Sequence, residues 1–179
     1  MLNNLLKSVP NTISLLNMSL GIISILIITR TDITNKATIV FVLVSFGGIL
    51  DVLDGYTAKK LNAFSDVGKQ LDSFADIVTF GIAPIALTAY FFGDVSLILL
   101  IFISLVYIFS AVYRLVRFNL SDPSRYFQGL PITAAGILLV AYFAVCAILS
   151  YQKNMFFTLI FVLALSAMMV SKVKIKRVF

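Results

Sequence analysis

The chain has no histidine, glutamate or tryptophan, and its single cysteine is Cys146. These absences exclude a Ser-His-Asp triad, a Cys-His pair, a zinc site built from thiolates and a disulfide framework. Cys146 lies in an apolar stretch, and we interpret it as a packing residue. All eight acidic residues are aspartates. Chemistry that requires a carboxylate side chain therefore depends on aspartate alone.

Charged residues are also scarce, at 12% of the 179 residues, whereas 60% are hydrophobic and the mean hydropathy is +1.04. Six apolar windows approach the ~20 residues that a spanning helix needs. They cover residues 12–29, 37–57, 70–92, 95–117, 131–149 and 155–171. The windows are continuously apolar, whereas the strands of a membrane barrel would alternate. We predict an all-α integral membrane protein with six transmembrane helices, forming one domain over residues 1–179.

Basic residues are distributed unequally between the segments that connect these windows. With the N-terminus inside, the cytoplasmic segments hold eleven of the fourteen lysines and arginines, and the outer side keeps Arg30, Lys36 and Lys153. The positive-inside rule then predicts that both termini are cytoplasmic, in a multi-pass protein of the cell membrane. We interpret the first apolar segment as a retained helix, because no small-residue cleavage pattern follows it. The net charge of +6 fits this topology and anionic lipid headgroups, so no nucleic-acid partner is expected.

Four of the aspartates lie where two neighbouring windows approach the cytoplasmic side. Asp51 and Asp54 close the second predicted helix at a spacing of three, and Asp72 and Asp76 open the third at a spacing of four. Each spacing puts its two carboxylates on one helix face. The second helix runs toward the cytoplasm and the third returns, so the two ends share one membrane depth. We predict that the four carboxylates converge on a polar metal-binding cavity open to the cytoplasm.

Such an acidic cluster requires cations or shared protons. One aspartate within a spanning helix costs roughly 2.5–3.5 kcal/mol on insertion scales, and mutual repulsion adds to this cost. Oxygen ligands favour a hard cation, so we predict Mg²⁺ or Mn²⁺. Two ions about 3.5–4 Å apart would satisfy four carboxylates and suit phosphoryl transfer. The alternative is that the aspartates cap helices or pair with Lys59, Lys60 and Lys69, which suits Asp66 better than these four.

Small residues extend the acidic faces of both helices. Gly55 and Ala58 follow the aspartates of the second helix by one turn, and Gly68 precedes those of the third. Small side chains in a membrane usually indicate close packing between helices. Here they also leave space beside the carboxylates for a flat or extended ligand, and spacing alone does not separate the two interpretations.

Together these residues form a pattern that resembles the signature of the CDP-alcohol phosphatidyltransferase family. The pattern is Asp51-x2-Asp54-Gly55-x2-Ala58-Lys59-x8-Gly68-x3-Asp72-x3-Asp76. Seven of the eight fixed positions of the family signature are present. The exception is Lys59, where the family usually has arginine. Lysine keeps the charge but lacks the planar bidentate fork, so a phosphate contact there would be looser.

The resemblance implies a role for each of these residues. It makes Asp51, Asp54, Asp72 and Asp76 the ligands of two divalent ions, with Asp76 also the general base that deprotonates the acceptor alcohol. The residues implied to bind CDP-diacylglycerol are Gly55, Ala58, Lys59 and Gly68. The implied reaction is attack of the alkoxide on the lipid-linked phosphorus with release of CMP. Members of the family are usually homodimers surrounded by membrane lipids.

Further stretches resemble the phosphatidylserine synthase branch of this family, in particular its short Gram-positive type. They are SFADIVTFGIAP at residues 73–84, RLVRFN at 114–119, QGLP at 128–131, and VPNT at 9–12 with Asn17 and Gly21. Thr133 departs from the branch, whose members commonly carry proline there. The branch implies CDP-diacylglycerol and L-serine as the substrates.

Two arginines near the cytoplasmic end of the fourth predicted helix are candidates for binding the acceptor. Arg114 and Arg117 lie one turn apart, suited to a serine carboxylate or a lipid phosphate, and Asn119 would cap the helix or contact substrate. Their alternative role is anchoring at the membrane surface. Glycerol 3-phosphate or inositol phosphate stays open as the acceptor, because two arginines do not decide it. A cation transporter is the alternative from another class, but no acid lies at mid-membrane in the other helices to continue an ion path.

Overall fold

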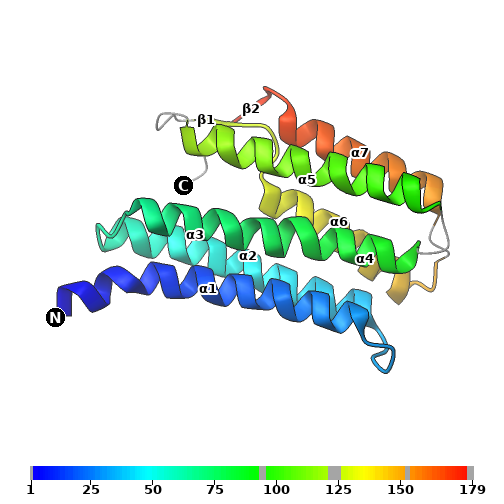
Figure 1. The fold of residues 1–179 in the computed structure, drawn as a ribbon, viewed down its shortest axis with the longest axis horizontal. Helices are drawn as coiled ribbons and strands as arrows, with labels where there is room; N and C mark the ends of the chain where they lie inside the picture. Colours follow the sequence, from blue (N-terminus) through cyan, green and yellow to red (C-terminus); the bar gives the residue numbers. More distant parts are fainter. Residues whose placement is uncertain (1, 93–95, 121–125, 152–153, 177–179) are drawn as a thin grey trace.

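Over the residues that the structure describes, the protein is a bundle of six helical rods, each antiparallel to the next along the chain (Figure 1). The computed structural model describes residues 2–92, 96–120, 126–151 and 154–176, with the backbone alone for 2–7, 126–128 and 174–176. The elements are α1 (Leu2–Thr29), α2 (Lys36–Lys60), α3 (Asp66–Asp76), the π-helix η1 (Ile77–Ile82), α4 (Ala83–Phe91), α5 (Leu97–Leu120), β1 (Tyr126–Gln128), α6 (Ile132–Ile148), α7 (Met155–Val170) and β2 (Lys174–Lys176). Because α3, η1 and α4 are continuous, they form a single rod.

The predicted all-helical architecture is confirmed in its main features, and part of it fits a membrane protein. Four helical segments are long and apolar enough to cross a membrane: residues 8–29, 36–60, 66–91 and 97–120. The helices α6 and α7 have 17 and 16 residues. At ~1.5 Å per residue they reach about 25 Å, short of the ~30 Å of a hydrocarbon core. A total of six membrane spans therefore stays a prediction.

Large apolar side chains cover much of the outer surface of the bundle. Leu26 is 60% exposed, Ile98 81% and Phe109 65%. A soluble monomer rarely exposes contiguous apolar patches of this kind, whereas a surface in contact with lipid requires them. The same surface explains why the apolar windows read as continuous: the helices are apolar both toward the core and toward the surroundings.

The π-helix in the third rod has a local cause. Pro84 has no amide hydrogen to donate to the carbonyl of Phe80, four residues earlier in the chain. Instead, the buried hydroxyl of Tyr107 on α5 donates to the Phe80 carbonyl at 3.1 Å. The side chain of Thr79 donates to the carbonyl of Asn17 on α1 at 2.9 Å. Hydrogen bonds to α1 and α5 thus hold the π-helix, which begins at the residue after Asp76.

Glycines on three helices allow close approach to this π-helix. A Cβ placed on Gly136 of α6 would lie 2.7 Å from the carbonyl oxygen of Phe80, and one on Gly21 of α1 would lie 2.8 Å from the Cα of Thr79. Gly47 of α2 has the same role, because a Cβ there would lie 2.9 Å from the Thr79 methyl. Such contacts leave no space for a side chain. The backbone that follows Asp76 is therefore enclosed by α1, α2 and α6.

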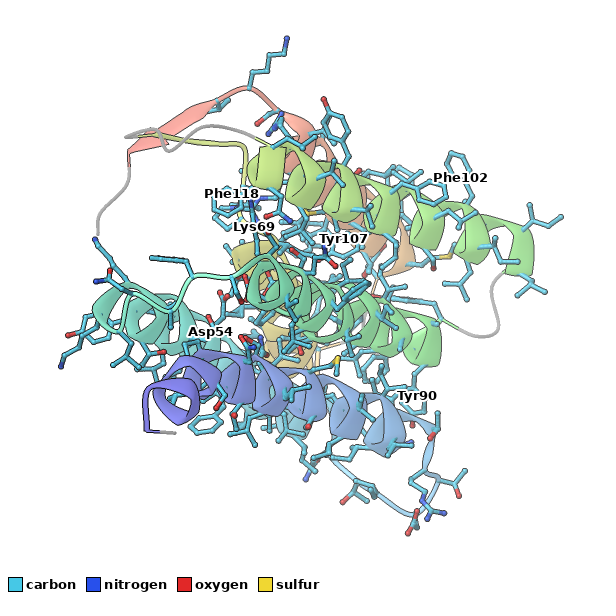
Figure 2. The ribbon with its side chains drawn as sticks, turned by 60° about the vertical axis from the view of Figure 1, so that its left-hand side comes forward. Asp54, Lys69, Tyr90, Phe102, Tyr107 and Phe118 are labelled. Carbon is cyan, nitrogen blue, oxygen red and sulfur yellow. The ribbon has the colours of Figure 1, made fainter. Side chains whose placement is uncertain are left out.

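A buried lysine joins three helices at the opposite end of the bundle. Lys36, the first residue of α2, is 5% exposed, and its ammonium donates to the carbonyl of Ile28 at 3.0 Å. The same ammonium lies 4.1 Å from the ring centroid of Tyr90 at the end of α4. Figure 2 shows Tyr90 at this end, far from Asp54 and Lys69. The contact satisfies the charge and holds α1, α2 and α4 in register.

A two-stranded antiparallel pair, β1–β2, joins the chain before α6 to the chain after α7, with Phe127 opposite Ile175. Nearby, the Gly129 amide donates to the carbonyl of Val173 at 3.0 Å, and Gly129 has a φ of 77°. A Cβ at Gly129 would lie 2.4 Å from the carbonyl oxygen of Met169. Only glycine fits that backbone position. The sequence did not predict these short strands, because three residues are too few to show an alternation of apolar and polar side chains.

Candidate metal centre

The turn between α2 and α3 places the two pairs of aspartates at the same end of the bundle. Asn62 reverses the chain with a positive φ of 47°, which asparagine tolerates better than most residues. Ser65 then caps α3, and its side-chain oxygen accepts a hydrogen bond from the amide of Gly68 at 3.0 Å. The acidic ends of α2 and α3 therefore face each other across a five-residue connection, residues 61–65.

Three of the four aspartates meet between these helix ends. Asp51, Asp72 and Asp76 each present one carboxylate oxygen within 4.8 Å of the others. Asp76 is only 5% exposed. The Oδ1 atoms of Asp72 and Asp76 are buried and have no hydrogen-bond partner among the described residues. Buried acceptors without a donor are costly, so this centre is suited to a cation.

The donor set also fits a hard divalent ion. It consists of carboxylate oxygens alone, since the chain has no histidine and its one cysteine lies elsewhere. Mg²⁺ and Mn²⁺ prefer such ligands, whereas zinc and copper favour imidazole or thiolate. The acidic cluster that the aspartate spacing predicted is thus able to hold a metal ion.

Asp54 lies outside this group of three, on the side of α2 that faces α1. Its Oδ2 accepts a hydrogen bond from the Ser14 hydroxyl at 2.8 Å, and the carboxylate is 5% exposed. The Ser14 hydroxyl has a second acceptor, the carbonyl of Pro10 at 3.2 Å. If the Asp54 side chain turns away, the Ser14 hydroxyl can therefore donate its single hydrogen bond to the Pro10 carbonyl instead. The structure brings three of the four predicted metal ligands together, and the role of Asp54 as a ligand remains a prediction.

Asp51 is held from the opposite side. The Thr133 hydroxyl, in the first turn of α6, donates to the Oδ2 of Asp51 at 3.0 Å. Sequence reasoning did not identify Ser14 or Thr133 as partners of the aspartates. Thr133 was noticed only as a departure from related sequences, and Ser14 carried no signal, because both contacts join residues 40 or more positions apart.

One buried cation accompanies the carboxylates. Arg114 of α5 is 7% exposed and interacts electrostatically with Asp76, Asp51 and Asp72. Its guanidinium lies 5.5 Å from the ring centroid of Phe118, one turn along α5. The positive charge offsets part of the repulsion among the three carboxylates. Of the two predicted arginines, Arg114 is the one beside the acidic cluster.

Arg117 and Asn119 connect helices instead. The Arg117 guanidinium donates to three carbonyls at the end of α7, those of Val170 at 3.0 Å, Ser171 at 3.1 Å and Met169 at 3.4 Å. Asn119 donates from its side chain to the hydroxyl of Ser73 at 2.8 Å, and its carbonyl accepts from the ammonium of Lys69. These contacts fix α5 against α7 and α3, and Ser73 is the residue next to Asp72.

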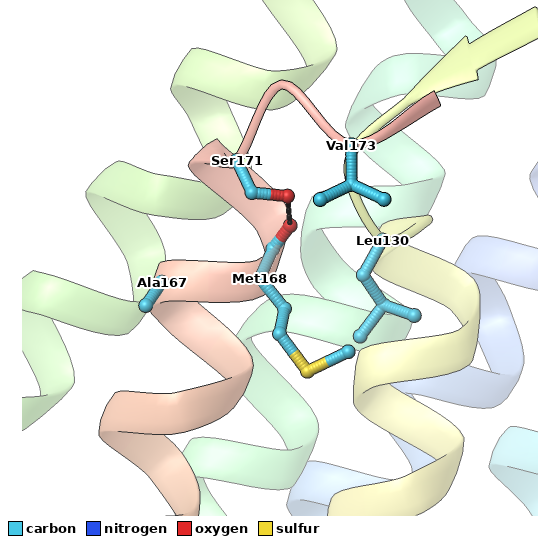
Figure 3. Close-up of a pocket in the computed structure, with 5 residues that line it drawn as sticks. All are labelled: Leu130, Ala167, Met168, Ser171 and Val173. Carbon is cyan, nitrogen blue, oxygen red and sulfur yellow. Dashed lines mark hydrogen bonds between the residues drawn. The ribbon is translucent and has the colours of Figure 1, made fainter. Parts of the chain in front are cut away.

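An apolar pocket of about 320 Å³ lies beside the end of α7 (Figure 3). It is lined by Leu130, Ala167, Met168, Ser171 and Val173. The Ser171 hydroxyl donates to the carbonyl of Met168 at 2.8 Å and so presents no free proton to the pocket. None of these five residues carries a carboxylate, and none belongs to the acidic cluster.

The structure gives the predicted small residues different surroundings. Gly55 is exposed, and a Cβ there would meet nothing within 4 Å in the described part of the chain. Gly68 is packed, because a Cβ there would lie 2.7 Å from the side-chain oxygen of Asn11 on α1. Ala58 is half-buried and Lys59 is exposed. Open space beside the aspartates is therefore found at Gly55, and close helix packing at Gly68.

Comparison with known proteins shows which family the sequence matches. The family described as CDP-alcohol phosphatidyltransferase matches residues 7–170 of the chain. A Bacillus subtilis CDP-diacylglycerol–serine O-phosphatidyltransferase is 38% identical over 93% of this chain and 88% of its own length. A protein of the same name from Methanocaldococcus jannaschii is 30% identical over 75% of this chain and 60% of its own. An archaetidylserine synthase from Methanothermobacter thermautotrophicus is 28% identical over 96% of this chain and 70% of its own length.

Proposed function

The chain belongs to the CDP-alcohol phosphatidyltransferase family, and on that premise we propose that it makes phosphatidylserine from CDP-diacylglycerol and L-serine, releasing CMP. The observation that carries the serine assignment is the similarity to the Bacillus subtilis serine enzyme, which extends over 88% of that protein. The cluster of Asp51, Asp72 and Asp76 supports the chemistry, because phosphoryl transfer depends on neutralising charge at the phosphates. Several other relatives of the same name are longer than this chain, which spans 60% of the Methanocaldococcus protein.

Each carboxylate of the cluster has a proposed task. Asp51, Asp72 and Asp76 would hold the divalent cation, Mg²⁺ or Mn²⁺, and Asp54 would complete a second site after leaving Ser14. When bound, such ions neutralise the charge that develops on the transferring phosphoryl group. The Oδ1 of Asp76 is buried and has no donor in the part of the chain that the structure describes, which supports its assignment as the acceptor of a proton.

The reaction follows from these assignments. Asp76 takes the proton from the serine hydroxyl, and the resulting oxygen attacks the phosphorus that carries the diacylglycerol. A new O–P bond forms as the bond to CMP breaks, and CMP leaves with the electron pair. Gly55 would accept the nucleotide, because the surface beside it is open. Contacts from Ala58, Lys59 and Gly68 to CDP-diacylglycerol are proposed from the family signature.

Arg114 is the proposed contact for the serine carboxylate or a lipid phosphate. Its burial beside the acidic cluster puts a guanidinium within the site, where paired hydrogen bonds to a carboxylate are strongest. Arg117 and Asn119 already bond to α7 and α3, so we propose that they hold α5, and with it Arg114, in place.

We propose that the chain crosses the cell membrane six times as a homodimer, with both termini and the acidic centre on the cytoplasmic side. One end of the bundle holds the first residues of α1 and α3 together with the last residues of α2 and α5, which supports this topology (Figure 1). In a Cys146→Ala background, Asn62→Cys should react with a membrane-impermeant thiol reagent from the cytoplasmic side alone. Labelling from the outer side of intact cells would overturn the topology.

The acceptor is tested by supplying alternative alcohols. Purified protein given CDP-diacylglycerol, Mg²⁺ or Mn²⁺ and labelled L-serine should release CMP and form labelled phosphatidylserine in equal amounts. Glycerol 3-phosphate and inositol phosphate should give at most a few per cent of that rate. A site built for one acceptor rejects another that leaves buried polar groups unpaired. Release of CMP with glycerol 3-phosphate but not with serine would contradict the serine assignment and retain the family reaction.

A further inference from the structure

We propose that Thr133 is a positioning residue, whose hydroxyl fixes the orientation of the Asp51 carboxylate and thereby sets the affinity of the metal centre. This inference rests on the proposed function, because it takes Asp51 to be a metal ligand. It concerns a contact between α6 and α2 that the aspartate signature does not contain: the Thr133 hydroxyl donates to the Oδ2 of Asp51 at 3.0 Å.

The contact is possible because α2 and α6 approach closely at Gly48, one turn before Asp51. A Cβ on Gly48 would lie 2.9 Å from the Cδ1 of Ile137 and 3.4 Å from the methyl of Thr133. The methyl of Thr133 thus packs on the bare surface of Gly48 while its hydroxyl reaches Asp51. Both branches of the threonine side chain are used, so its χ1 angle is fixed by packing as well as by the hydrogen bond.

The position of Thr133 in its helix leaves its proton available. Within helices, serine and threonine hydroxyls usually donate to the carbonyl four residues earlier, as Ser104 and Ser110 of α5 do. Thr133 is the second residue of α6, and the residue four positions earlier is Gly129, outside the helix. The local acceptor is therefore missing, and the hydroxyl bonds across to α2.

The start of α6 adds to this contact. Pro131 precedes the helix, and its carbonyl accepts a hydrogen bond from the amide of Ala135 at 3.0 Å. The Thr133 contact puts this first turn of α6 beside Asp51. The amino end of a helix carries partial positive charge, which favours a neighbouring carboxylate in its ionised form. Because Oδ2 accepts the Thr133 hydrogen bond, the whole Asp51 carboxylate is oriented, including the oxygen that lies within 4.8 Å of Asp72 and Asp76.

Metal affinity should depend on this hydrogen bond. Partners that orient a metal ligand typically change affinity by about 10- to 100-fold when removed. Without the hydroxyl, the Asp51 carboxylate can rotate. The conformational entropy lost when the ion orders it again would then oppose ion binding. We therefore expect Thr133→Val, which keeps the shape of the side chain, to raise the apparent Kd for Mn²⁺ by about 10-fold or more. Thr133→Ser, which keeps the hydroxyl, should stay close to wild type.

The experiment measures Mn²⁺ binding to the purified full-length chain by electron paramagnetic resonance, without lipid substrate. Thr158→Val is the matched control, because Thr158 also uses a buried hydroxyl, bonded to Tyr142 at 2.9 Å and remote from the aspartates. Thr133→Ala is a second variant that lacks the hydroxyl, and thermal melting checks that every variant is folded. In turnover, Thr133→Val should require more Mn²⁺ for half-maximal rate, with little change at saturating Mn²⁺.

The variant Asp51→Asn distinguishes failure of the role proposed for Thr133 from failure of the proposed metal centre. If Asp51→Asn loses Mn²⁺ binding while folded Thr133→Val and Thr133→Ala bind like wild type, the role of Thr133 is overturned and the metal centre stands. If Asp51→Asn binds Mn²⁺ as tightly as wild type, Asp51 is no ligand and the proposed metal centre itself is overturned. The expected result is weaker Mn²⁺ binding in Asp51→Asn, Thr133→Val and Thr133→Ala, with Thr133→Ser and Thr158→Val unchanged.

Discussion

The Asp76→Asn variant should release CMP from CDP-diacylglycerol and L-serine about 10²- to 10⁴-fold more slowly than wild type, the usual contribution of a general base. Asparagine has the shape of aspartate but cannot accept the proton of the serine hydroxyl. The Oδ1 of Asp76 is buried and has no donor among the described residues, so its lone pairs are available to accept that proton. The measurement is the initial rate of CMP release at saturating serine and Mn²⁺.

The matched control is Asp66→Asn, on the same helix. Asp66 is exposed in the first turn of α3, away from the cluster formed with Asp51 and Asp72. Its loss should leave the rate within about twofold, as for most surface substitutions. Because Asp76 is also a proposed ligand, Mn²⁺ binding is measured in parallel. Turnover by Asp76→Asn at a rate near wild type would refute its assignment as the base.

Removal of divalent cations should abolish the reaction, and adding back Mg²⁺ or Mn²⁺ should restore it. Stabilisation of phosphoryl charge by a metal is worth several kcal/mol, so the rate should fall by roughly a thousandfold or more. The physical reason is the donor set: Asp51, Asp72 and Asp76 bring three acidic groups within 4.8 Å, with Arg114 as the adjacent cation. The rate is measured after treatment with a chelator and gel filtration.

Two controls make the chelation result specific. Chelator already saturated with Mg²⁺ should have no effect, which excludes damage by the reagent. Metal should also raise the melting temperature of the wild-type protein more than that of Asp72→Asn, because ligands that bind only the folded state stabilise it. Full activity in a sample shown by elemental analysis to contain no divalent metal would contradict the proposed centre.

Much of this fold was predictable because it depends on local sequence. Continuous apolar windows predicted the positions of all six helical rods, since spanning helices need uninterrupted runs. The spacing of Asp72 and Asp76 by four residues predicted one shared helix face. The antiparallel return of the chain after α2 then predicted that Asp51 and Asp54 would join them, and Asp51 does.

The remaining features depend on neighbours that are distant in sequence. Asp54 is drawn toward α1 by Ser14, and Asp51 is held by Thr133 on α6. Helical spacing tells which face a carboxylate occupies, but not which hydroxyl from another helix will reach it. Arg117 shows the same limit, since its position beside Arg114 indicated a shared site, whereas its guanidinium binds the end of α7.

The π-helix between α3 and α4 has a consequence for how this bundle can adapt. One extra residue in a turn advances the side chains that follow by about 100° around the axis. The acids below Ile77 and the packing face above Ile82 are therefore phased separately, although they belong to one continuous rod. A regular α-helix over the same residues would therefore turn either Asp76 away from Asp51 and Asp72 or the residues after Ile82 away from their present neighbours.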